Sequence, residues 1–437
     1  MFRRAWEGLP QDLVFSDKLQ DIGYFINDAD EVRSRDNPNN YFKFSLSKSD
    51  RVNQRQRFHF HGALRSIIIN RLHKESLETI RLPLTVKTFQ QPHVQILVSR
   101  HISQRQRVVL FLGESLQNLG VLSFRIVGGR GGINEGSLVS LVQGLANQNS
   151  DPNDPHPPGI IVANLGENWW WPEGKKALSS TEFCGVPLTS AAYVGREHDE
   201  ELNTVPQLET WKKHLRYLID TALPSLVAHD ALIDVIAVGD AVDGFLEHLN
   251  NESVWTVHKH RLNACAFMGG AFYGESVKIP ELKAFLANRC RTWIVHQAPI
   301  NTPLLGSAGI RNPAINSLMG CPVYSSGEIY YNECSLTRVK DYVIEWLYEV
   351  SRTPDYKNPD LGDLPVLSGD VTDAEDEHWA VDADFEPHYI NPSCAEPDTV
   401  NETQTIERIL ADYRQWNRLK LQEVDEHVKN SESIPRK

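Results

Sequence analysis

Short apolar runs rich in β-branched residues alternate with longer amphipathic segments through the middle of the chain. The runs predict strands at 93–99, 108–113, 160–165, 233–238, 262–268, 291–296 and 322–325. Helical spacing predicts helices at 138–145, 207–228, 241–249, 280–288 and 336–350, while 121–127 suits a strand or the start of a helix. This alternation predicts an α/β fold with a mostly parallel sheet covered on both faces. The runs at 93–99 and 108–113 are expected to be adjacent strands.

The segment from Ile233 to Gly244 is an apolar run followed by a turn of small residues and a helix. This is the context in which α/β-hydrolases present their nucleophile. Alanine has no hydroxyl, thiol or carboxylate with which to attack a substrate. The sequence therefore predicts an α/β-hydrolase-like fold without a catalytic residue. Its degenerate nucleophile elbow, with Ala241 at the apex, is expected at Gly239, Asp240, Ala241, Val242, Asp243 and Gly244.

The two later positions of a hydrolase triad also lack their side chains. An acid is expected after a later strand and a histidine after the last one. The loop after 291–296 reads QAPINTPLLG, without a carboxylate, and the loop after 322–325 reads SGEIYY, without a histidine. Two alternatives stay open: a carboxylate nucleophile at Asp240 or Asp243, and a catalytic role for His296.

The net charge of −13 resides in the tail of the chain. Residues 358–407 hold fourteen Asp and Glu and no Lys or Arg, so a disordered acidic linker at 358–403 is expected to follow a domain at 1–357. Apolar residues at helical spacing, Tyr413 and Trp416 among them, predict an amphipathic helix at 404–430. This apolar stripe must be buried, either on the domain or on a partner.

Two further segments are candidate interaction surfaces. The most basic window, 42–76, includes Arg51, Arg55 and Arg57; it is interpreted as a solvated loop and helix face, with a phosphate-binding patch as the alternative. Three consecutive tryptophans cannot all point into one core, so either one or two of them lie at an exposed interaction surface, or they are buried under the loop itself. They are Trp169, Trp170 and Trp171, and they follow the strand at 160–165.

The motifs predict no cofactor and no metal site. The glycine cluster at 128–137 lacks the Walker lysine and the third dinucleotide glycine, and it is interpreted as a turn capped by Asn134 or Ser137. The histidine pairs at 59 and 61 and at 258 and 260 have no third ligand nearby, and six cysteines without a C-x-x-C pair are expected to be reduced. Without a signal peptide or a membrane-length apolar run, a cytosolic or nuclear location is expected.

Five segments together resemble the Argonaute-binding-protein-two domain family, over residues 10–358. They are LQDIGYFIND at 19–28, GGINEGS at 131–137, IIVANLGENWWWPEGKKA at 160–177, the turn at 239–244 and IVHQAPINTPL at 294–304. The resemblance implies an α/β-hydrolase-like fold. Some family members carry a histidine-serine-aromatic-glycine-glycine elbow, and alignment places the histidine on Asp240, the serine on Ala241 and the glycines on Asp243 and Gly244. The chain therefore departs from the family at the nucleophile.

The resemblance implies a non-catalytic adaptor in nuclear RNA-guided silencing. The namesake of the family is a subunit of the Argonaute siRNA chaperone complex, which supports heterochromatin formation. The implied partners are an Argonaute protein and a second chaperone subunit, with small RNA or chromatin reached through the complex. Related domains follow class II histone deacetylase domains, whereas this chain is expected to be of the stand-alone type. The alternatives are an esterase-like hydrolase with a displaced carboxylate nucleophile and a chromatin-binding module associated with a histone deacetylase.

Overall fold

Eight strands form one sheet at the centre of the residues that the computed structural model describes, which are 9–150, 154–193, 195–270, 274–304 and 319–359. The strands lie in the order β12-β11-β10-β9-β5-β6-β4-β3. Strand β4 runs antiparallel to both of its neighbours, and every other pair is parallel. In chain order the bounds are β3 Leu77–Leu82, β4 Val94–Ser99, β5 Arg107–Gly113, β6 Gly159–Asn164, β9 Leu232–Val238, β10 Leu262–Met268, β11 Cys290–Ile294 and β12 Val323–Ser325.

Numbered along the chain, these strands follow the order 1-2-4-3-5-6-7-8 with the second strand reversed, which is the sheet of the α/β-hydrolase fold. The predicted fold class is confirmed. The prediction that 93–99 and 108–113 are adjacent strands is wrong, because β6 lies between β4 and β5. Every residue of β6 is buried, and a strand that is apolar on both faces belongs inside a sheet.

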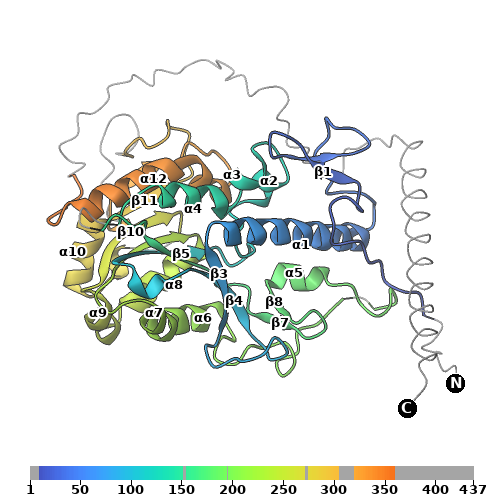
Figure 1. Cartoon of the computed structure of the whole chain (residues 1–437), viewed down its shortest axis with the longest axis horizontal. Helices are drawn as coiled ribbons and strands as arrows, with labels where there is room; N and C mark the ends of the chain where they lie inside the picture. Colours follow the sequence, from blue (N-terminus) through green and yellow to red (C-terminus); the bar gives the residue numbers. More distant parts are fainter. Residues whose placement is uncertain (1–8, 151–153, 194, 271–273, 305–318, 360–437) are drawn as a thin grey trace, which may run out of the picture.

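Helices cover both faces of the sheet (Figure 1). One face packs against α1 Asp50–Lys74, α4 Leu138–Ala146 and α12 Ser335–Arg352 through a continuous apolar core. The other face packs against α6 Trp211–Tyr217, the π-helical turn η3 Leu218–Ala222, α7 Leu223–Leu226, α8 Asp240–Leu249, α9 Glu252–His258 and α10 Pro280–Arg289. The predicted helix at 207–228 is present as one helical stretch from 211 to 226, with the π-helical turn η3 in its middle and right-handed helical dihedrals at both junctions.

Smaller elements surround this framework. Two hairpins pair β1 Tyr24–Ile26 with β2 Val32–Ser34, and β7 Trp169–Trp171 with β8 Lys176–Leu178. Short helices are α2 Phe124–Val127, α3 Gly132–Glu135, α5 Ser180–Gly185 and the single turns η2 Ile102–Gln104, η4 Gly274–Ser276 and η6 Asn332–Cys334. Helix α4 begins after Ser137, whose hydroxyl accepts the Val139 amide at 3.4 Å, which is the predicted cap after the glycine cluster.

A buried ion pair holds the amino ends of the central strands together. Arg107 on β5 donates from Nε to Asp234 Oδ2 on β9 at 2.6 Å, and both side chains are almost completely buried. Asn263 on β10 donates to the other Asp234 oxygen at 2.8 Å.

Among the described residues no helix combines the length and the apolar composition that a membrane span requires. The predicted linker at 358–403 lies outside the described residues except for its first two positions. The predicted helix at 404–430, with Tyr413 and Trp416, lies entirely outside them.

Candidate functional site at the carboxyl edge of the sheet

The turn between β9 and α8 has a glycine at its apex. Strand β9 ends at Val238, α8 begins at Asp240, and Gly239 between them has φ 59° and ψ −127°. This left-handed conformation favours glycine, and the strained residue between strand and helix is the nucleophile position of an α/β-hydrolase. Gly239 has no side chain, so the position that would carry the nucleophile is empty.

The prediction that Ala241 occupies the apex is therefore wrong by two residues. Ala241 lies in the first turn of α8 and is fully buried in the core. Gly244, which suggested the wrong register, is small for another reason. A Cβ atom there would lie 2.3 Å from the Trp211 ring, so its absence lets α6 pack closely on α8.

Glu114 fills the space in front of the apex. It directly follows β5, and a Cβ atom placed on Gly239 would lie 3.2 Å from both Cγ and Oε1 of Glu114. Burial, and then the like charges of Asp240 and Glu333, raise the pKa of the Glu114 carboxyl above its usual value. Sequence reasoning missed this residue, although a carboxylate directly after a buried parallel strand was the available signal.

Asp240 occupies the place of an oxyanion hole. In α/β-hydrolases the backbone N–H after the nucleophile and an N–H from the loop after an earlier strand stabilise the developing oxyanion. Here the Ser115 N–H after β5 donates to Asp240 Oδ1 at 3.1 Å. A substrate carbonyl would have to displace an anion from this donor, so Asp240 blocks the site.

The positions of the triad acid and histidine contain structural groups. His296, after β11, is exposed, and its Nδ1 accepts the Ala298 amide at 3.0 Å. Glu328, after β12, accepts the amides of Ile329, Tyr330 and Tyr331 through Oε1 at 3.1 to 3.4 Å. Within the described part of the chain, no nucleophile, acid and histidine come together at this edge. Residues 305–318 of the loop after β11 lie outside that part.

The segment after β12 folds back over the edge towards the loop after β5. Glu333 accepts from Gln117 Nε2 at 2.7 Å and pairs with Arg125 Nε at 2.9 Å. The Arg125 guanidinium also lies 3.7 Å from the centre of the Tyr331 ring. These contacts hold the two loops together. They fix the segment after β12 over the edge of the sheet at which α/β-hydrolases carry their catalytic residues.

The three tryptophans form strand β7, and none of them is exposed. Trp170 is buried against the main core, whereas Trp169 and Trp171 face the opposite side and pack with Phe58 and Phe183. Alternation along a strand sends neighbouring side chains to opposite sides, so the row is divided between two apolar clusters. The expectation of an exposed tryptophan surface is therefore wrong.

Most of the basic window lies in helix α1. Carboxylates from other parts of the chain pair with most of its arginines. Asp12 pairs with Arg51 at 2.7 Å and with Arg55 at 2.9 Å. Arg51 also donates to the carbonyls of Ser190, Ala191 and Tyr193, and Arg55 to that of Cys184. These two arginines have a structural role. Of the three candidates only Arg57 is exposed, with its guanidinium 5.6 Å from the Phe44 ring.

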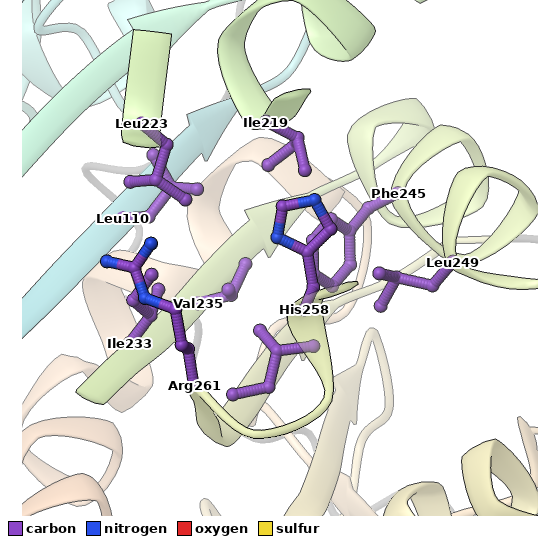
Figure 2. Close-up of a pocket in the computed structure, with 10 residues that line it drawn as sticks. Leu110, Ile219, Leu223, Ile233, Val235, Phe245, Leu249, His258 and Arg261 are labelled. Carbon is purple, nitrogen blue, oxygen red and sulfur yellow. The ribbon is translucent and has the colours of Figure 1, made fainter. Parts of the chain in front are cut away.

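A small apolar void lies beneath β5 and β9, away from this edge (Figure 2). Aliphatic and aromatic side chains from η3, α7 and α8 surround it, and His258 and Arg261 approach its rim. His258 and His248 share Asp220, at 3.4 and 2.9 Å, which ties α8 and α9 to η3. The void belongs to the core. No group of side chains suited to a metal ion occurs among the described residues.

Comparisons with known proteins identify one sequence family and several distantly similar structures. The sequence profile of the Arb2 domain matches residues 15–300. A comparison with curated protein sequences gives no match. Among solved structures, a histone deacetylase from Saccharomyces cerevisiae has a TM-score of 0.36 and 12% identity, covering 65% of this chain and 96% of that chain.

Esterases are also among the similar solved structures. A Bacillus cereus carboxylesterase has a TM-score of 0.29 and 11% identity over 58% of this chain and 93% of that chain. A Pyrobaculum calidifontis esterase has a TM-score of 0.31 and 10% identity over 70% and 95% of the two chains. Likeness this distant carries no argument about chemistry, so the assignment of the fold rests on the strand order.

Proposed function

Because the chain belongs to the Arb2 domain family, we propose that it is a non-catalytic adaptor of nuclear RNA-guided silencing. In this proposal it assembles with an Argonaute protein and a second chaperone subunit, and it reaches small RNA and chromatin through that complex. The family supplies the context, and the carboxyl edge of the sheet supplies the reason for assigning no catalysis.

The observation that carries the proposal is the state of the elbow. Gly239 provides no nucleophile, Glu114 fills the space in front of it, and Asp240 engages the Ser115 N–H. Each change alone opposes acyl transfer, and the loss of any triad member costs several powers of ten in rate. A fold that keeps its sheet but carries three such changes is better suited to binding than to turnover.

Affinity purification of the full-length tagged chain from nuclear extract tests the proposal. We expect an Argonaute protein with bound small RNA and a chaperone subunit to co-purify. Trp416→Ala should reduce the recovery of Argonaute at least about tenfold, as removal of a central aromatic contact does. Trp379→Ala, in the acidic linker, is the matched control and should leave recovery unchanged. Recovery of neither Argonaute nor a chaperone or chromatin partner would refute the adaptor.

A hydrolase with a displaced carboxylate is the second candidate, and one observation favours it. Glu114 is a carboxyl of raised pKa next to the nucleophile position, and catalytic carboxyls often have raised pKa values. This candidate requires turnover of an ester that disappears in Asp240→Asn or Glu114→Gln. The adaptor requires no turnover at all.

A further inference from the structure

The carboxyl edge of the sheet exposes apolar side chains that a monomeric surface would ordinarily cover. Leu116 after β5 is 57% exposed, Ile300 after β11 38%, and Ile329 and Tyr330 after β12 are 56% and 77% exposed. We call these four side chains, together with Glu114 and Asp240, the edge surface. Exposed apolar groups gathered in one region mark interaction sites more often than scattered ones do.

Contacts between the loops join the edge surface into one region. A Cβ atom on Gly327 would lie 2.4 Å from Ile300, so the loops after β11 and β12 touch. Tyr330 lies beside Tyr331, which packs on Arg125, and Gln117 next to Leu116 donates to Glu333. The loops that carry the four apolar side chains therefore lie beside one another at the carboxyl edge.

Glu114 lacks a cationic partner within this surface. Among the described residues no hydrogen-bond donor or cation pairs with its carboxylate. The charged groups that raise its pKa are the carboxylates of Asp240 and Glu333. A partly buried carboxylate beside two like charges is stabilised by any cation that reaches it. The edge surface thus favours an apolar occupant that carries a positive charge.

The chain contains a segment with this composition. From Arg408 to Leu421 it holds four cationic side chains and one carboxylate, within the apolar stripe at 404–430. Lys420 stands four residues after Trp416 and four before Val424, so helical spacing places its cation on the apolar side. A lysine within an apolar stripe matches a carboxylate within an apolar surface.

The connecting chain is long enough to allow this contact. Asn358 donates to the carbonyl of Cys290, the first residue of β11, so the described chain ends at the amino edge of the sheet. A seven-residue strand spans roughly 23 Å. A chain with as many residues as lie between Pro359 and Gln404 would span about 35 Å if it were a flexible coil, which is long enough to bridge the sheet. Tethering at this length gives an effective concentration on the order of millimolar, which populates even a weak contact.

We infer that segment 404–430 docks on the edge surface of its own chain, with the Lys420 ammonium against the Glu114 carboxylate and the apolar stripe on Leu116, Ile329 and Tyr330. This contact covers Tyr413, Trp416 and the edge surface at once. A partner that binds either of them must first displace the other, so the contact is autoinhibitory. The inference does not depend on the proposed function, because it concerns only this chain.

Hydrogen exchange on the full-length chain tests the inference. The amides of Ile329, Tyr330 and Tyr331 should exchange about tenfold faster in Lys420→Glu than in the wild type, because the docked segment shields them. Lys429→Glu is the matched control: it reverses a lysine of the same segment away from the apolar stripe, and exchange should not change. Adding Glu114→Lys to Lys420→Glu should restore slow exchange by reversing the pair.

Carbodiimide coupling provides an independent measurement, since it joins amines and carboxylates that are in contact. We expect a link between Lys420 and Glu114 in the wild-type chain. Links from Lys420 to the acidic linker alone, or no change in exchange at the edge in Lys420→Glu, would overturn the inference. Protection that depends on chain concentration would place the segment on a second copy and would also overturn the intrachain contact.

Discussion

Gly239, Glu114 and Asp240 determine what the carboxyl edge can do. The glycine accommodates a backbone conformation that a side chain would strain, Glu114 takes the space that such a side chain would need, and Asp240 engages the backbone donor that an oxyanion would need. The three changes support one another, because the absence of a side chain at Gly239 is what admits Glu114. Restoring a serine at 239 would therefore not restore a hydrolase.

Gly239→Ala should destabilise the fold by about 1–3 kcal/mol, the usual cost of a non-glycine residue held in this backbone region. The added Cβ atom would also lie 3.2 Å from the Glu114 side chain. Denaturant unfolding measures the difference. Gly195→Ala, at a position with open space around it, is the control and should be neutral. Equal stability of Gly239→Ala and wild type would contradict the assigned turn.

In the Lys420→Glu background, where the proposed ion pair is absent, Glu114→Gln should raise the unfolding midpoint at neutral pH. The raised pKa means that the folded chain binds this proton more tightly than the unfolded chain. The stability that the protonated carboxyl contributes is fully present below about pH 4.5, its usual pKa, and is lost as the pH rises through the folded pKa. The amide removes that loss. Thermal unfolding at pH 4 and pH 7 should show the gain only at pH 7, with Glu345→Gln as an exposed control on α12.

Among the elements, most of the strands and helices that follow β9 could be predicted from sequence, because each is a run with one clear period; the short helix α9 was not predicted. Strand β10 and helices α8, α10 and α12 lie within a residue or two of their predicted bounds. The full extent of helix α1 could not be predicted, because its buried face contains Arg55, His59 and Arg65, whose polar side chains contact carboxylates far along the chain. The place of β6 depends on pairing, which local patterns do not report.

The sequence located the turn of the candidate site but misplaced its apex. Gly239 and Gly244 are small for different reasons, and together they suggested the wrong register, with Ala241 between strand and helix. Asp12 pairs with residues distant in sequence, so no local motif reports it, whereas the position of Glu114 directly after a buried parallel strand was a signal that could have been used.

The pair of Arg107 and Asp234 should be essential to the junction of β5 and β9. Asp234→Ala leaves the Arg107 guanidinium buried without its partner, which costs roughly 3–5 kcal/mol. The double variant Arg107→Met/Asp234→Leu removes both charges and should recover most of that loss. Chemical unfolding of the two variants beside the wild type decides the matter. A double variant no more stable than the single one would show that the pair contributes more than charge balance.

As a whole, the molecule is a sheet between two apolar cores, and two histidines in apolar surroundings make it sensitive to acid. Burial lowers the pKa of His61 to about 3 and that of His214 to about 4, against 6.5 for a free imidazole. The unfolded chain therefore binds these protons first. Stability is fully present above about pH 6.5 and is lost as the pH falls towards 4 and below.

His61→Phe should weaken this dependence on pH. The His61 ring stacks on the Phe124 ring with 3.7 Å between the ring centres, and a phenyl ring keeps that contact without binding a proton. The variant should lower the slope of unfolding free energy between pH 6 and pH 4 by about 1.4 kcal/mol per pH unit, the value for one proton. His229→Gln, at an exposed position, is the control and should not alter the slope. An unchanged slope in His61→Phe would mean that this imidazole does not titrate on unfolding.

Ester hydrolysis by the purified full-length chain tests the central claim, that the chain has the fold of a hydrolase without its chemistry. Hydrolases that lose their triad keep some rate through the oxyanion hole, but here Asp240 also engages the Ser115 donor. A broad panel of activated esters and acyl substrates should therefore be hydrolysed no faster than in buffer. Turnover that disappears in Asp240→Asn or Glu114→Gln would contradict the account and establish a hydrolase with displaced carboxylates.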